Sequence, residues 1–170
     1  MTNSLLHLQA TTLSDERVLR AIELIWKEAA ILDAKDYPAW EEMFTDEGYY
    51  VVPIDPDTED FAASLNMIYD DKRMRRLRVE RMMQGYAPSA VAAARTARVV
   101  STFVVKSVSD EEVVIRSTQV LTAFKRNSHQ TLGAELTHTI ALSDEGDRIA
   151  QKVARLINSE DAVSAAGFLI

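Results

Sequence analysis

The chain has 170 residues, of which 47% are hydrophobic and 26% charged, and its net charge is −7. This composition is typical of one soluble globular domain with a sizeable core, and the negative charge argues against a nucleic-acid binder. The chain has no cysteine, which excludes disulfides, thiol catalysis and cysteine-ligated clusters. We find no signal peptide and no long apolar run, so we expect a cytoplasmic protein that does not enter a membrane.

The N-terminal part predicts two helices. Ser14 can cap a first helix that extends to about Asp33. The apolar residues of this helix recur at helical spacing and form one stripe: Val18, Ile22, Ile25, Trp26 and Ala29. Asp36 can cap a second, short helix, with Pro38 near its start and Gly48 beyond its end.

A strand and a third helix follow. The run "YYVVPI" predicts a strand that Pro53 and Pro56 stop. After an acidic loop, residues 70–83 predict a helix that ends at Gly85. We expect an irregular connection from Pro88 to Ala94.

The last seventy or so residues predict a sheet. Four β-branched runs are separated by turn-forming residues, and they cover residues 97–108, 111–124, 130–142 and 148–158. Four strands in meander order after helices indicate an α+β domain with a curved, largely antiparallel sheet. The third run alternates cleanly, whereas the first has apolar residues on both faces. That pattern leaves two alternatives: a surface for a partner protein or a tightly curled sheet.

Histidines are the first candidates for chemistry. Glu135 and His138 form an E-x-x-H pattern, but in a strand two residues three apart point to opposite sides. His7 lies in a terminal segment and His129 in a turn, so we expect no metal site.

His138 also shares the apolar face of its strand. It is either a hydrogen-bonded core residue or an acid/base residue in an apolar pocket. In the second case its partners are Asp33, Asp36, Tyr49 or Tyr50, and we take His138, Tyr49 and Asp33 as the candidate pocket. No nucleophile elbow or phosphate-binding glycine motif is present.

The third predicted helix carries the strongest charge feature of the chain, a run of six basic residues among acidic ones. A solvated helix face supported by i,i+4 pairs is one explanation. A docking surface for an acidic partner is the other.

Four stretches resemble one family in order and spacing. They are "EAAILDAKDYPAWEEMFTDEGYYVVP", "SLNMIYDDKRMRRLRVERMMQG", "ARTARVVSTFVV" and the ending "AGFLI". Together they resemble the small (beta) subunit of the aromatic-ring-hydroxylating dioxygenases. Two positions depart from the pattern: Ala93-Ala94 replaces a Pro-Ser pair, and Asp147-Arg148 stands where the family has a Trp in the last hairpin.

The resemblance implies an NTF2-like cone in which about three helices and the curved sheet form one domain of residues 1–170, with residues 1–13 as an extended arm. It implies a homotrimer that binds three alpha subunits, and these alpha subunits carry the Rieske iron–sulfur cluster and the mononuclear iron. It implies no cofactor, metal or catalytic residue in this chain. We expect five arginines at the partner interface: Arg73, Arg75, Arg76, Arg78 and Arg95.

Two hypotheses for the function follow. In the first, the chain is the non-catalytic subunit of a cytoplasmic dioxygenase that dihydroxylates an aromatic compound. In the second, it is a stand-alone isomerase, dehydratase or cyclase that uses acid/base residues in an apolar pocket. Since one fold hosts both roles, the fold alone does not choose between them.

Overall fold

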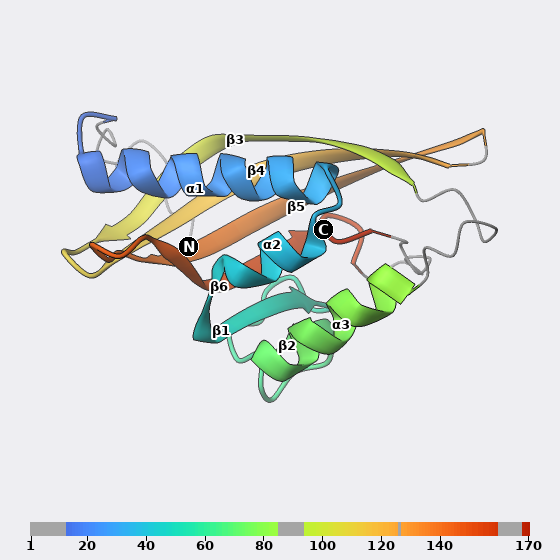
Figure 1. Cartoon of the computed structure of the whole chain (residues 1–170), viewed down its shortest axis with the longest axis horizontal. Coiled ribbons are helices and arrows are strands. Elements are labelled where there is room, and N and C mark those ends of the chain that lie inside the picture. The colour runs from blue at the N-terminus through green and yellow to red at the C-terminus, as the bar shows by residue number, and fades with distance from the viewer. Residues whose placement is uncertain (1–12, 85–93, 126, 160–167) are drawn as a thin grey trace.

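Figure 1 shows the computed structural model of the chain, a curved six-stranded sheet with helices packed on it. The structure describes residues 13–84, 94–125, 127–159 and 168–170. The helices are α1 (Glu16–Asp33), α2 (Tyr37–Glu42) and α3 (Lys72–Gln84). The strands are β1 (Phe44–Pro53), β2 (Asn66–Asp70), β3 (Arg95–Val108), β4 (Glu112–Lys125), β5 (Ser128–Ala141) and β6 (Arg148–Leu156).

The order of the strands confirms the predicted meander. The sheet runs β2-β1-β6-β5-β4-β3, and every neighbouring pair is antiparallel except β1 with β6. Helix α1 packs along β3 and β4, and α3 lies beside β1 and β2 (Figure 1). Strand β2 is not among the predicted elements, and the third helix begins at Lys72 because Asp70 is the last residue of β2.

Helix α1 ends where the sequence predicts, but two of its residues differ from expectation. Asp15, not Ser14, is the N-cap, and its carboxylate accepts a hydrogen bond from the backbone N–H of Arg17 at 3.0 Å. Trp26 is 52% exposed, so it does not belong to the buried stripe. Its indole N–H instead reaches over strand β3 and donates to the carbonyl of Val100 at 3.0 Å.

The chain from α2 into β1 follows the prediction except at Gly48. Asp36 caps α2 by accepting from the backbone N–H of Ala39 at 3.2 Å, and Trp40 and Phe44 are buried. Gly48 lies within β1 rather than at a turn. A Cβ at this position would come within 2.9 Å of the carbonyl oxygen of Ile149 on β6, so the close approach of two backbones requires the glycine.

Two bulges in β3 explain why that strand is apolar on both of its predicted faces. The pairing with β4 shifts between Ser101 and Val104, and Thr102 has a φ of 55°. Before the bulge Val100 is buried and Val99 is 66% exposed. After this first bulge the inward residues are Phe103 and Val105, and a second shift of the pairing between Val105 and Ser107 brings Val108 to the same face. The two extra residues keep Val100, Phe103, Val105 and Val108 on one face.

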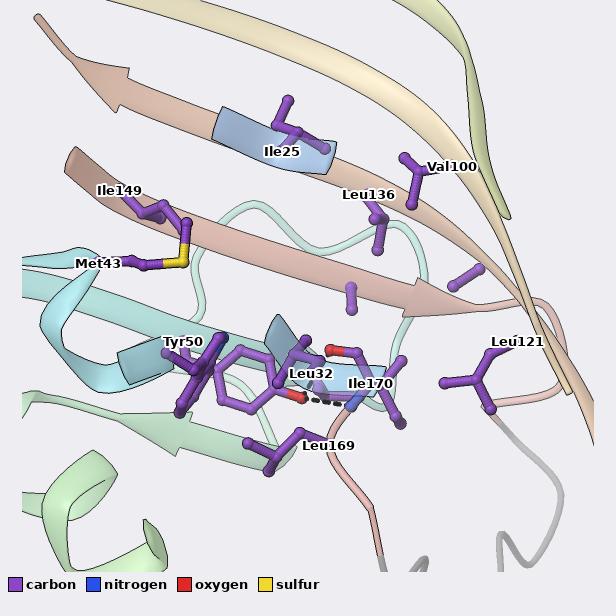
Figure 2. Packing of buried hydrophobic residues seen from close by; sticks show 14 of the residues in the cluster. Ile25, Leu32, Met43, Tyr50, Val100, Leu121, Leu136, Ile149, Leu169 and Ile170 are labelled. Carbon is purple, nitrogen blue, oxygen red and sulfur yellow. Dashed lines mark hydrogen bonds between the residues drawn. The ribbon is translucent and has the colours of Figure 1, made fainter. Parts of the chain in front are cut away.

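The main hydrophobic core lies between the sheet and α1. The described residues closest to the C-terminus join it, since Phe168, Leu169 and Ile170 are all buried. Figure 2 shows the hydroxyl of Tyr50 directed at Ile170, whose carbonyl accepts from it and whose N–H donates to it, both at 3.1 Å. Most of the predicted arm, Gly85 and most of the Pro88–Ala94 connection lie outside the described residues.

Candidate functional site

A cluster of four buried polar side chains lies inside the curved sheet. The carboxylate of Glu28 accepts hydrogen bonds from Nε2 of His138, from Nζ of Lys152 and from the indole N–H of Trp40. The three distances are 2.8, 2.8 and 2.9 Å. All four residues are essentially inaccessible to solvent. We call them the Glu28 cluster.

Three parts of the fold bring the Glu28 cluster together. Glu28 stands on the buried stripe of α1, three residues after Ile25 and four before Leu32. His138 on β5 and Lys152 on β6 are directly opposed in the antiparallel pairing and face the core. Trp40 comes from α2. The cluster therefore links α1, α2 and the centre of the sheet.

The electrostatics of the cluster are those of a buried ion pair. Burial alone would raise the pKa of Glu28, but the charge of Lys152 and the hydrogen bond from His138 hold that pKa far below its usual range. Burial lowers the pKa of Lys152, and Glu28 opposes the shift. Because the carboxylate only accepts hydrogen bonds, Nε2 of His138 is the donor in this contact.

The structure does not bring His138, Tyr49 and Asp33 together. Asp33 lies at the end of α1, where it accepts hydrogen bonds from the Thr96 hydroxyl at 2.8 Å and from the backbone N–H of Arg98 at 2.9 Å. Tyr49 packs with the smaller cluster of Val51, Phe61 and Val153, and its ring stacks on Tyr69. The predicted carboxylate partner of His138 is wrong, because the partner is Glu28.

Glu28 and Lys152 were not predicted as site residues, although the sequence carries a signal for both. Each is a charged residue at a position that the apolar period assigns to the core. A charge at such a position needs a partner of opposite sign, because an unpaired buried charge is very costly. Only the register of β5 against β6 shows which partner it has.

The basic side chains of α3 mostly contact other residues of this chain. Arg75 is buried, donates to the carbonyls of Gly48 and Thr45, and lies 4.4 Å from the centre of the Phe44 ring. Arg78 pairs with Asp70 through a contact of 2.5 Å. Neither guanidinium is presented to a partner in the way predicted.

The other three arginines of the predicted interface, and Lys72 beside them, stand nearer the surface. Lys72 pairs with Asp46 at 2.6 Å, and Arg76 lies 3.7 Å from Glu41. Arg73 is exposed on the same helix. Arg95, at the start of the edge strand β3, is also exposed.

A groove of about 620 Å³ lies between α3 and the first part of β1. It has an apolar floor of Tyr49 and Leu77 and a rim of both signs of charge. The rim residues are Asp46, Glu47, Asp71, Lys72, Arg73, Arg76 and Glu80. The mixed rim fits a polar protein surface better than a simple anion.

Among the described residues, no group of three or more His, Asp or Glu side chains is placed to hold a metal ion. Glu135 faces outward near Arg116 while His138 is buried, as the strand geometry predicts. His129 is exposed against the ring of Phe124, and His7 lies outside the described residues. No helix in the described part of the chain is long and apolar enough to cross a membrane.

Solved structures place the fold in a known class. The chain superposes on the beta subunit of benzoate 1,2-dioxygenase from Burkholderia mallei with a TM-score of 0.74 and 17% identity, covering 88% of this chain and 95% of that one. A naphthalene 1,2-dioxygenase structure with indole bound gives 0.66 at 19% identity, covering 85% and 86%. An NTF2-like protein from Novosphingobium aromaticivorans gives 0.57 at 15% identity, covering 88% of each chain. The fold is thus the NTF2-like α+β cone that the sequence predicts.

The family follows from the sequence itself. The model of the ring hydroxylating beta subunit family matches residues 27–160, most of the chain. The chain therefore belongs to the ring-hydroxylating beta subunit family, which confirms the resemblance. No curated protein matches the chain in sequence.

Proposed function

We propose that this chain is the non-catalytic subunit of a Rieske-type ring-hydroxylating dioxygenase, in which an iron-containing alpha subunit dihydroxylates an aromatic substrate. The family match over residues 27–160 carries the proposal. The Glu28 cluster supports it, because its charges are inaccessible and satisfy one another inside the core. Because these groups are enclosed and paired with one another, none of them is exposed to a substrate.

The assembly we propose has three copies of this chain as a trimer and three alpha subunits. The alpha subunits carry the Rieske cluster and the mononuclear iron, and this chain, as one domain, holds no cofactor. The complex acts in the cytoplasm in the breakdown of aromatic hydrocarbons.

The part of α3 that faces the groove is the surface that we propose for the alpha subunit. Arg73 and Arg76 are exposed there, above the floor of Tyr49 and Leu77. Arg95 is a second exposed cation, at the start of the edge strand. Arg75 and Arg78 support this surface from inside through their contacts with β1 and Asp70.

Affinity purification of the tagged chain from its native cells tests the proposal. We expect an iron–sulfur alpha subunit to co-purify in equal amount, identified by mass spectrometry. Replacing both Arg73 and Arg76 with Glu should reduce the amount recovered, whereas Lys106→Glu, a charge reversal on the exposed part of β3, should not. A chain that purifies alone would contradict the proposal.

The Glu28–His138 contact favours a second candidate, an acid/base enzyme of the isomerase, dehydratase or cyclase type. A protein proposed to be a scytalone dehydratase, from Novosphingobium aromaticivorans, shares the fold with a TM-score of 0.65 at 12% identity, covering 88% of this chain and 91% of that one. This candidate requires that the isolated chain turn over a substrate without an alpha subunit. His138→Gln should then abolish turnover while the circular dichroism spectrum stays unchanged.

A further inference from the structure

Strand β3 forms one edge of the sheet, and side chains from α1 reach its free side. The strand has 14 residues, whereas β2 at the opposite edge has 5. A long edge strand presents a row of unpaired N–H and C=O groups, to which a strand of another chain can add. The contacts between α1 and β3 therefore bear on how copies of this chain can associate.

Two side chains of α1 bind backbone groups of β3 that point away from β4. The carboxylate of Asp33 accepts from the backbone N–H of Arg98 at 2.9 Å, and the indole N–H of Trp26 donates to the carbonyl of Val100 at 3.0 Å. Residues two apart in an antiparallel strand direct their backbone groups to the same side. One donor and one acceptor of the free edge are thus occupied from within the chain.

Further contacts hold these two side chains in place. The ring of Trp26 lies edge-on against Phe103, with 5.6 Å between the ring centres. Asp33 also accepts from the Thr96 hydroxyl and forms an ion pair with the guanidinium of Arg98. Since these contacts already order both side chains, their hydrogen bonds to the edge require little further loss of side-chain freedom.

The two occupied backbone groups are complementary to the same strand of a second copy. If two β3 strands paired antiparallel around Val99, the N–H of Arg98 in each copy would donate to the carbonyl of Val100 in the other. The two Val99 side chains, each 66% exposed, would then lie opposite each other. Val120 is opposite Val99 on β4 and is 46% exposed, so an apolar row would continue across the junction. The pairing of β3 with β4 is regular over residues 97–101, so no bulge interrupts this contact.

We propose that the β3 edge around Val99 is an interaction surface for β3 of a second copy of this chain, and that Trp26 and Asp33 block it. The block prevents edge-to-edge pairing, so copies of the chain associate through other surfaces. The proposal concerns this chain alone and does not depend on binding to an alpha subunit.

Disulfide trapping tests the proposal, because the chain has no cysteine of its own. In the proposed pairing the two Val99 Cα atoms would be about 4.5 Å apart, within reach of a disulfide. With oxidised glutathione, Val99→Cys should form a linked dimer about tenfold faster in the double variant Trp26→Ala with Asp33→Ala than in the otherwise native chain. A tenfold ratio corresponds to about 1.4 kcal/mol, in the range of the net contribution of one hydrogen bond.

Val120→Cys is the matched control, since Val120 is exposed on the same face but lies one strand further from the edge. Edge-to-edge pairing would leave the two Val120 positions about 14 Å apart, too far for a disulfide, so its rate should not change between the two backgrounds. The single variant Trp26→Ala keeps the ion pair of Asp33 with Arg98 and should give a smaller gain at Val99→Cys. It carries the test if circular dichroism shows that the double variant does not fold.

Two results would overturn the proposal. Equal rates for Val99→Cys with and without the blocking side chains would show that they do not control access to the edge. An equal gain at Val120→Cys would show that the replacements loosen the whole fold rather than open one strand.

Discussion

A single carboxylate joins three parts of this fold. Glu28 of α1 accepts hydrogen bonds from Trp40 of α2 and from two neighbouring strands, through His138 and Lys152. Replacing a buried ion pair with apolar residues is often neutral, but removing one member leaves a charge without compensation. The cluster is therefore a point at which one substitution has a large effect.

We predict that Glu28→Gln lowers the free energy of unfolding by about 3 kcal/mol, because the Lys152 ammonium loses its counter-charge. Urea denaturation followed by circular dichroism measures the change. The double variant Glu28→Gln with Lys152→Met should recover part of the loss, since it removes the unpaired charge. A double variant that is less stable than Glu28→Gln would show that the ion pair is not the origin of the effect.

Two arginines of α3 should respond differently to one replacement. Arg75→Met removes a buried guanidinium that donates to two carbonyls of β1, so we expect a loss of about 2 kcal/mol in the free energy of unfolding. Arg73→Met changes an exposed side chain and should stay within about 0.5 kcal/mol. Thermal unfolding of both variants checks the prediction, and equal stabilities would contradict the buried placement of Arg75.

At the scale of the elements, pairing between strands depends on the space above each backbone. At Gly48 an added Cβ would be 2.9 Å from the carbonyl oxygen of Ile149, which the β1–β6 pairing holds in place. At Gly133 the nearest atom is Cδ1 of Ile157 at 3.0 Å, the far end of an exposed side chain. The first neighbour cannot move without disturbing the sheet, and the second can rotate away.

We therefore predict that Gly48→Ala lowers the free energy of unfolding by about 2 kcal/mol, through backbone displacement at the β1–β6 junction. Gly133→Ala should cost less than about 0.5 kcal/mol. Chemical denaturation of both variants provides the comparison. A Gly133 variant as unstable as the Gly48 variant would contradict the difference between a fixed and a movable neighbour.

Elements whose apolar residues recur at a regular spacing were predictable from the sequence. Features that depend on pairing between residues far apart in the chain were not. The apolar period of α1 and the alternation of β5 gave their limits to within a few residues. The bulge at Thr102 could not be located from the sequence. A strand with one extra residue looks, in sequence, like a strand with apolar residues on both faces. Strand β2 was missed because it has only five residues and its three apolar residues are consecutive, so its sequence does not alternate.

The candidate site shows the same division. That His138 faces the core follows from alternation along its own strand. Its partner does not, because the Glu28–His138 contact joins residues 110 positions apart in the chain. Likewise, the sequence gives six basic residues on one helix, but only the packing of α3 against β1 separates buried Arg75 from exposed Arg73.

At the scale of the whole molecule, the buried ion pair links stability to pH. The pKa of Glu28 is lower in the folded chain than in the unfolded chain, because Lys152 and His138 outweigh the opposite effect of burial. The ionised carboxylate thus contributes stability that is fully present above the unfolded pKa of about 4.3 and is lost as the pH falls.

We predict that the free energy of unfolding of the native chain declines between about pH 5 and pH 3 more steeply than that of Glu28→Gln, which has no carboxylate to protonate at that position. Urea titrations at several pH values in this range measure both slopes. Other carboxylates whose pKa is also lowered, such as Asp15 beside Arg17 and Asp46 beside Lys72, are common to both proteins. Parallel curves would show that Glu28 does not carry the effect.

The different positions of the two tryptophans have a spectroscopic consequence. Trp40 is enclosed in the core beside Glu28, whereas the ring of Trp26 lies half in solvent over strand β3. Their fluorescence should have a short-wavelength component from the first and a long-wavelength component from the second. In Trp26→Phe the remaining emission comes from Trp40 and reports loosening of the interior. In Trp40→Phe it comes from Trp26 and reports contacts made at the edge strand β3. The protein thus carries two intrinsic fluorophores, one for its folding and one for whatever approaches its surface.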